Sequence, residues 1–467
     1  MRLVSGSGGL SRRTLLKAGS AAAGMGALGA LGGLARPALA SSVAATITFA
    51  YFGDPKQATS MRESLLPLVK KVDQNADLKV VGYNGTDWND FFAKILTQIA
   101  AGAPPDIVGV ATEGVQLMAG KDLAVPLDDY VKRDMAELKE MFADVDPILI
   151  EGLMYDGHLF ELPVNFNAGN MFYSTKLFKQ AGLDRPADNW TMDDFQSYAK
   201  KIAAIPDVNA FDWIVRLWGS WTCFMYANGG NLLEEQRFDG GQWLWDAAYP
   251  GNASVKSRKG GWKWGAPTAN SAPTVEALQL MIDLRKQGLA PSPDVGGGGT
   301  LQGLFASNRI GMTIGGGFWA GGLHNAGMTP DSFDVQYFPK WKEQKHLFGV
   351  VGNAILKSSK NQDLAWEVVK QLSAADAFDL QFPGNATTPV RRSLMTPERY
   401  KTTGPEHWSV FYDTLTKFEN TTPIPAPPYY NALANALNRR TTEAIASGDA
   451  KSALDGLQKD LEAASKT

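Results

Sequence analysis

The chain has 467 residues, with 45 Lys and Arg against 48 Asp and Glu, so its formal net charge is −3. This balance argues against a nucleic-acid or anionic-membrane surface, and a hydrophobic content of 44% is enough for globular cores. The length exceeds one comfortable core and predicts two lobes, and a single cysteine, Cys223, excludes an intramolecular disulfide.

The first forty residues have the pattern of an export signal. Arg12 and Arg13 form a twin-arginine pair, a glycine-studded apolar run follows, and Ala38-Leu39-Ala40 is a small-x-small cleavage site. The run is weak for a spanning helix, although a retained membrane anchor is the alternative. Removing its five basic residues leaves 40 against 48 acidic ones, a charge near −8. We expect a mature periplasmic protein from about Ser41, exported by the twin-arginine pathway without a lipid anchor.

The next segment predicts a crossover unit of a parallel sheet. Strand, helix and strand alternate at a spacing that requires parallel strands joined by helices. The elements are a strand at 45–52 ending in Gly53-Asp54-Pro55, a helix at 61–72, a strand at 78–81, a helix capped by Thr86 or Asp87 and stopped by Gly102, and a strand at 107–110.

Later segments predict further helices and one more strand. Their helical pieces are amphipathic and bounded by polar caps or glycines. They are a helix opening at Thr191, a helix at 276–287 closed by Gly288, a linker or mobile loop at Gly296–Gly299, a strand at 310–314, and helices at 363–372, 433–445 and 450–463.

Four tryptophans predict a hairpin between Phe238 and Trp264. Trp243 and Trp245 are two residues apart, as are Trp262 and Trp264, so each pair would share one face of a strand. The turn signal Pro250-Gly251-Asn252 lies between them. The hairpin could wall one end of a cleft or pack on itself at the surface.

Most signatures of enzymes are missing. None of the four histidines (158, 324, 346 and 407) belongs to a metal-binding spacing, Cys223 reads as a small buried hydrophobe, and Gly315-Gly316-Gly317 lacks the pattern of a phosphate loop. We expect no catalytic residue, cofactor or metal. Sequence spacing does not exclude the paired carboxylates of a glycoside hydrolase, because such pairs are assembled in space.

Aromatic residues suggest the kind of ligand. The chain has 13 tryptophans, more than packing alone usually recruits. The C–H face of a sugar lies well on an indole, and its hydroxyls make strong hydrogen bonds to carboxylates and amides. Aromatic and polar residues placed where strands end therefore suit a saccharide.

An ordered series of segments resembles the family 1 extracellular solute-binding proteins, the sugar-binding components of ABC importers, which include maltose-binding protein. Each segment alone is degenerate, but together they cover nearly the whole mature chain in order. They are DGHLFELP at 156–163, NMFYSTKLF at 170–178, Ala181-Gly182-Leu183, KILTQIAAGAPPD at 94–106, YANGGNL at 226–232, the stretch 305–319, and Ala365-Trp366-Glu367.

The resemblance implies a type II-like periplasmic binding protein fold of two α/β lobes, joined by crossover segments, with a ligand cleft between them. The N-terminal lobe would comprise 41–166 and about 345–387, and the C-terminal lobe 167–344 and about 388–467. The implied function is to bind a sugar or oligosaccharide, as a monomer, and to deliver it to membrane permease subunits. The alternatives are a glycerophosphodiester or polyol phosphate, for which Arg216 or Arg391 could supply the cation, and a secreted glycoside hydrolase or lyase.

The resemblance also implies a set of ligand-binding residues. Asp54 and Glu113 would bind hydroxyls, although a turn cap and a helix N-terminal acid are their respective alternatives. Asn167 would act at the first crossing or bond only to backbone. Of Trp218 and Trp221, one should face the cleft and the other the core. Trp319 and Tyr430 complete the main set, and Tyr51, Phe52, Asn353 and Arg391 are further candidates.

Overall fold

The structure is a computed structural model that describes residues 45–295, 298–418 and 420–466. The predicted export signal and its cleavage site lie outside these residues. Among the helices of the described ranges, none combines the length and the apolar character needed to cross a membrane.

A seven-stranded sheet organises the first half of the fold. Its order is β16-β6-β15-β3-β1-β2, with β17 added at the end of β15. β1 is parallel to β2 and β3, whereas β15 is antiparallel to β3 and β6. The strands are β1 (Thr46–Phe52), β2 (Asp77–Tyr83), β3 (Ile107–Ala111), β6 (Glu161–Ala168), β15 (His346–Ile355), β16 (Thr388–Pro389) and β17 (Thr421–Pro423).

The predicted crossover unit is confirmed. α1 (Ala58–Val72) connects β1 to β2, and α2 (Trp88–Ala100) connects β2 to β3. Asp87 is the cap of α2, because its side chain accepts a hydrogen bond from the Asp90 N–H at 3.2 Å. α3 (Thr112–Gly120) follows β3 directly, so the N-termini of α2 and α3 lie at the carboxyl ends of β2 and β3, the two strands that flank β1.

A four-stranded sheet organises the second half, in the order β14-β7-β13-β8. β13 is parallel to β8 and antiparallel to β7, and its bounds agree with the predicted strand. Helix α7 begins at the predicted cap, where Thr191 and Asp194 form a capping box. The elements are β7 (Asn170–Ser174), β8 (Asn209–Asp212), β13 (Ile310–Gly315), β14 (Phe333–Gln336), α7 (Met192–Ala203), α8 (Trp221–Ala227), α10 (Ala272–Lys286), α11 (Gly299–Ala306) and α12 (Phe318–Asn325).

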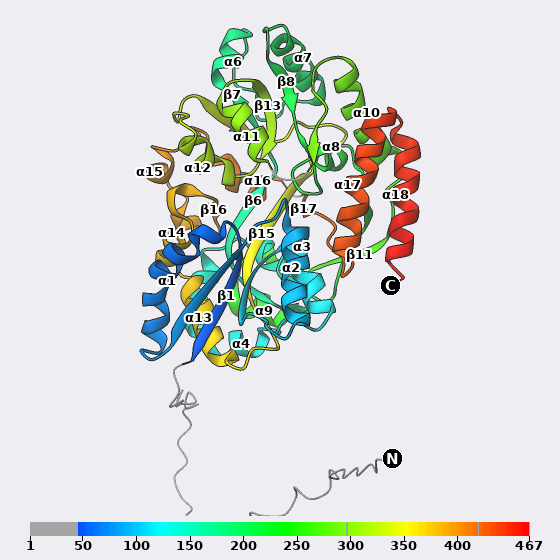
Figure 1. Cartoon of the computed structure of the whole chain (residues 1–467). Helices are drawn as coiled ribbons and strands as arrows, with labels where there is room; N and C mark the ends of the chain where they lie inside the picture. Colours follow the sequence, from blue (N-terminus) through cyan, green and yellow to red (C-terminus); the bar gives the residue numbers. More distant parts are fainter. Residues whose placement is uncertain (1–44, 296–297, 419, 467) are drawn as a thin grey trace, which may run out of the picture. The chain divides into compact units, whose positions relative to one another are not determined.

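The chain passes between the two sheets twice, and the segment that joins β16 to β17, both of the first sheet, contacts the second sheet. The chain leaves the first sheet after Ala168 and enters the second at Asn170, returns between β14 and β15, and connects β16 to β17 through α16 (Val410–Thr416). α16 packs with residues of the second sheet, since Phe411 stacks on Phe172 of β7. The last helices, α17 (Tyr430–Ser447) and α18 (Ala450–Ala464), lie side by side as orange and red ribbons in Figure 1.

The predicted tryptophan hairpin is wrong. Trp243 and Trp245 belong to a helix, α9 (Gln242–Ala248), and β11 (Trp262–Pro267) pairs instead with β10 (Leu233–Arg237). Gly240 and Gly241 both have positive φ, which ends the ribbon and starts the helix. Burial follows the helical spacing of Leu244, Trp245 and Ala248, all packed in the core of the first half.

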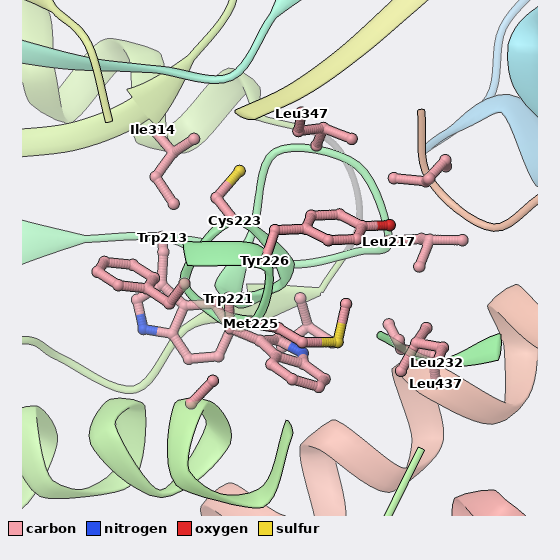
Figure 2. Packing of buried hydrophobic residues seen from close by; sticks show 14 of the residues in the cluster. Trp213, Leu217, Trp221, Cys223, Met225, Tyr226, Leu232, Ile314, Leu347 and Leu437 are labelled. Carbon is pink, nitrogen blue, oxygen red and sulfur yellow. The ribbon is translucent and has the colours of Figure 1, made fainter. Parts of the chain in front are cut away.

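The core around α8 is dense and aromatic (Figure 2). Trp221 is fully buried there, and its indole N–H donates to Thr441 Oγ1 of α17 at 3.1 Å. Cys223 lies in the same cluster, as predicted for a small buried hydrophobe, and burial raises the pKa of its thiol to about 12. Part of the predicted Gly296–Gly299 linker lies outside the described residues, and α11 begins at Gly299.

Candidate functional site

A cavity of about 860 Å³ opens where both halves of the fold contribute side chains. It lies beyond the carboxyl ends of β1 and β3, where ligands bind in open α/β sheets. The first half supplies residues of β1, α2 and α3, and the second half supplies the loop before α8 and the start of α12. The segment 380–387, which leads into β16, lines another side.

Two pairs of aromatic rings wall the cavity. Phe52 and Trp88 lie with ring centroids 4.9 Å apart, and Trp218 and Phe318 lie 5.9 Å apart. Trp88 begins α2 of the first half, whereas Phe318 begins α12 of the second. All four side chains are half-buried. They therefore present apolar faces from different halves to one space.

Three charged residues line the cavity: Asp87, Glu113 and Arg216. Glu113, in the first turn of α3, is only 3% exposed, and its Oε2 accepts a hydrogen bond from the Thr112 hydroxyl at 3.0 Å. Burial, helped by Asp87, raises the pKa of Glu113 to about 7 although its own backbone N–H and Arg216 oppose the shift. Burial also raises the pKa of Asp87.

Arg216 enters the cavity from the loop before α8, with its guanidinium 5.8 Å from the centroid of the Trp218 ring. Its Nε has no hydrogen-bond partner among the described residues. Burial lowers the pKa of Arg216 to about 10, against the attraction of Asp87 and Glu113. A buried donor without a partner is costly, so an oxygen of a ligand would satisfy it.

A network of amide side chains connects the N-terminus of α12 to the end of β6, where the chain first passes from one sheet to the other. Asn167 Oδ1 accepts from the Phe318 N–H at 3.1 Å, and its Nδ2 donates to the Thr387 hydroxyl at 3.3 Å. That hydroxyl donates to Asn165 Oδ1 at 3.2 Å. Asn353 of β15 also lines the cavity, and its buried Nδ2 has no partner within the described ranges. It is a second donor open to a ligand.

Seven of the eleven predicted site residues line this cavity. They come from both halves and from the final helices, so the residues that the resemblance implied, although far apart in the sequence, lie around one cavity. They are Tyr51, Phe52, Glu113, Asn167, Trp218, Asn353 and Tyr430.

The other four predicted residues lie elsewhere. Asp54 is exposed and caps a 3-10 turn, accepting from the Lys56 N–H at 2.9 Å. Trp221 lies in the core, whereas its neighbour Trp218 lines the cavity. Trp319 is 2% exposed, packs on Phe172 and Phe305, and borders a smaller hollow of about 310 Å³. Arg391 forms an ion pair of 2.7 Å with Asp144 and does not reach the cavity.

Sequence reasoning missed several lining residues. Asp87 and Trp88 follow the end of β2, so the strand-end signal used for Glu113 could have found them. Phe318 directly precedes the predicted Trp319, an error of one residue. Arg216 was considered only as a phosphate ligand. The aromatic Phe382 lies in an irregular segment that gives no periodic signal.

Comparisons with known proteins agree on one kind of protein. The family model described as bacterial extracellular solute-binding protein matches residues 58–377. A protein of Brucella abortus, provisionally named a binding protein, is 24% identical over 293 residues, which are 62% of this chain. The match spans 63% of that relative's length.

Solved structures share the fold over most of both chains. An ABC substrate-binding protein from Listeria monocytogenes, in complex with cycloalternan, aligns with a TM-score of 0.69 and 22% identity, covering 89% of this chain and 98% of its own. A solute-binding protein of an ABC transporter from Agrobacterium radiobacter, in complex with ribitol, aligns with a TM-score of 0.70 and 21% identity, covering 91% and 99%. At these identities the likeness shows the fold: two lobes with a cleft between them.

Proposed function

The chain belongs to the bacterial extracellular solute-binding protein family, and from this premise we propose that it is the substrate-binding component of an ABC transporter. Its ligand is a neutral sugar or oligosaccharide, which it delivers to membrane permease subunits. The family and the similar structures are binding proteins, and we propose that this chain likewise performs no chemistry on its ligand.

The observation that carries this proposal is the combination of aromatic and polar groups in the cavity. The Phe52–Trp88 and Trp218–Phe318 pairs offer flat apolar faces from opposite halves. The same cavity is lined by charged and amide groups with unsatisfied hydrogen-bonding capacity, among them Arg216 and Asn353. Sugar rings need both kinds of surface, because their C–H faces are apolar and their rims carry hydroxyls.

Binding would act through closure of the two lobes. We assign 41–166 with about 345–387 to one lobe and 167–344 with about 388–467 to the other. Ligand contacts from both lobes favour the closed form over the open one, since a ligand shifts an equilibrium only by its differential affinity. A micromolar dissociation constant requires about 8 kcal/mol, a reasonable total for two stacked faces and several charged hydrogen bonds.

We also propose where in the cell the protein acts. A twin-arginine signal would place the mature chain, without a lipid anchor, in the periplasm. There it would work as a monomer that diffuses between the outer membrane and its permease. The signal lies outside the described residues, so this part of the proposal rests on the amino-acid pattern and on the family.

A phosphorylated polyol is the second candidate ligand, and Arg216 favours it. An arginine without a hydrogen bond at Nε is a natural partner for a phosphate. Arg391, the other arginine considered, is paired with Asp144 outside the cavity. Asp87 and Glu113 beside Arg216 disfavour an anion, so the neutral sugar is the better match.

A thermal-shift panel of the mature protein tests the function. The panel contains maltose, maltotriose, ribitol and glycerol 3-phosphate, and each mixture is then analysed for products. We expect a neutral sugar to stabilise the protein, by about 2.7 kcal/mol at one hundred times its dissociation constant, and to be recovered unchanged. Released products would instead identify an enzyme, and stabilisation by glycerol 3-phosphate alone would favour the second candidate.

A further inference from the structure

Glu113 occupies an unusual position in the cavity. Its carboxyl group is almost completely buried, and the hydrogen bonds that it accepts come from the hydroxyl of Thr112, its neighbour in the chain, and from its own backbone N–H. No lysine, arginine or histidine among the described residues forms an ion pair with it. A carboxylate in such a place lacks the partners that would normally keep it charged.

Titratable groups face Glu113 from each surrounding element. Asp87 caps α2, Glu161 belongs to β6, Arg216 precedes α8 and Tyr430 begins α17. Glu161 is itself 1% exposed and its Oε2 has no partner in the described part of the chain. Asp87 therefore opposes a charge on Glu113, and Arg216 favours it without forming an ion pair. The N-terminus of α3 favours the charge as well.

The balance of these effects brings the pKa of Glu113 close to neutral pH, so that its protonated form is well populated there. Burial dominates the pKa of Glu113, Asp87 adds to the shift, and the resulting value is about 7. A ligand that fills the cavity removes further water from the carboxyl group. Closure of the site would therefore raise the pKa of Glu113 again, unless the ligand brought its own positive charge.

We propose that Glu113 binds the ligand in its protonated form, as a hydrogen-bond donor to an oxygen of a neutral sugar, so that each binding event is linked to proton uptake above neutral pH. The inference rests on the proposed function and adds the chemistry of one contact. The ligand atom that contacts Glu113 is then an oxygen that accepts a hydrogen bond, such as a ring oxygen or a hydroxyl oxygen.

Calorimetric titration of the protein with the stabilising sugar, between pH 6 and pH 8.5, tests this proposal. If only the protonated form binds and the pKa of Glu113 in the free protein is about 7, the apparent dissociation constant rises about 30-fold over this range. At pH 8 the binding enthalpy should depend on the ionisation enthalpy of the buffer, with an uptake of about one proton.

Three variants locate the effect. Glu113→Gln keeps an N–H donor without the titration, so its affinity should stay near the low-pH value of the wild type and vary less than about twofold with pH. Asp87→Asn retains a helix cap but removes a neighbouring charge, so its pH dependence should move to lower pH. His324→Gln removes an exposed imidazole on α12 and should retain the wild-type pH dependence.

Several results would overturn the proposal. An affinity independent of pH in the wild type, with no proton uptake, would show that Glu113 does not change its protonation on binding, while sugar binding itself would stand. Loss of binding by folded Glu113→Gln at every pH would show that the carboxylate is required. If Glu113→Gln fails to fold, the buffer dependence of the wild-type enthalpy decides alone. Failure of every sugar to bind would overturn both this inference and the proposed function.

Discussion

The position of Trp218 depends on a glycine, Gly349 of β15, which leaves room for the indole ring. A Cβ added at Gly349 of β15 would lie 3.0 Å from Trp218 Nε1 and 3.4 Å from the Thr112 hydroxyl oxygen. The same small site therefore supports one aromatic wall and the residue that hydrogen-bonds to Glu113. Neither contact can be read from the sequence, because Gly349 is 131 positions from Trp218 and still farther from Thr112.

We predict that Gly349→Ala weakens sugar binding about three- to tenfold, because Trp218 must move by a few tenths of an ångström. Calorimetric titration measures the change. Gly303→Ala on α11 is the matched control, since a Cβ there meets no atom within 4 Å. Equal affinities for the two variants would show that Trp218 does not bind the ligand or that its position is not critical.

Some of the residues that the resemblance implied lie near the end of a strand and line the cavity. Glu113 follows β3 and Asn167 lies near the end of β6, and both line the cavity. The choice between Phe318 and Trp319 was not predictable from the pattern. Both begin α12, and successive residues of a helix point in directions about 100° apart. Phe318 consequently lines the main cavity while Trp319 packs in the core.

At the scale of elements, the β10–β11 ribbon forms an additional connection between the two halves, through the packing of its side chains. Leu233 at one end of the ribbon packs in the cluster that contains α8, and Trp262 packs in the core of the first half. Arg237 lies 3.8 Å from the centroid of the Trp262 ring and forms ion pairs with Glu151 and Glu235. Glu151 is 1% exposed, so its partners matter.

We predict that Arg237→Ala lowers the free energy of unfolding by about 1–3 kcal/mol, because it removes a cation–π contact and one partner of a buried carboxylate. Urea denaturation measures the loss. Arg439→Ala is the control: its ion pair with Asp460 lies at the surface of the last helices, with the Arg439 side chain 55% exposed, and should contribute less than about 1 kcal/mol. A loss no larger than that of the control would mean that the ribbon does not stabilise the fold.

Elements with local signals were predicted well. Thr191 and Gly288 mark helix ends in the structure as they do in the sequence, because caps and left-handed glycines act within a few residues. The spacing of two residues between Trp243 and Trp245 predicted a strand, but these tryptophans lie in a short helix. Only the packing of Trp245 against the core of the first half, formed by distant residues, selects the helix.

At the scale of the whole molecule, the length of the chain predicted two lobes and the family resemblance implied that both are α/β, and the comparisons with solved structures confirm this fold. The lobe boundaries remain a proposal. The first sheet continues to Ala168, two residues beyond the predicted boundary, and α9 packs in the core of the first half although its sequence falls within the predicted C-terminal lobe. The lobe to which such an element belongs is set by tertiary contacts, and no local sequence pattern encodes these contacts.

The claim on which the account depends is that a sugar is held between aromatic residues of the two halves. Trp88 and Trp218 belong to different halves, and both line the cavity. Calorimetric titration of Trp88→Ala and of Trp218→Ala with the stabilising sugar tests it most directly. The account predicts that each substitution weakens binding at least tenfold, because each removes a stacking face. If either variant, properly folded, binds as tightly as the wild type, the ligand does not lie between the two halves as described.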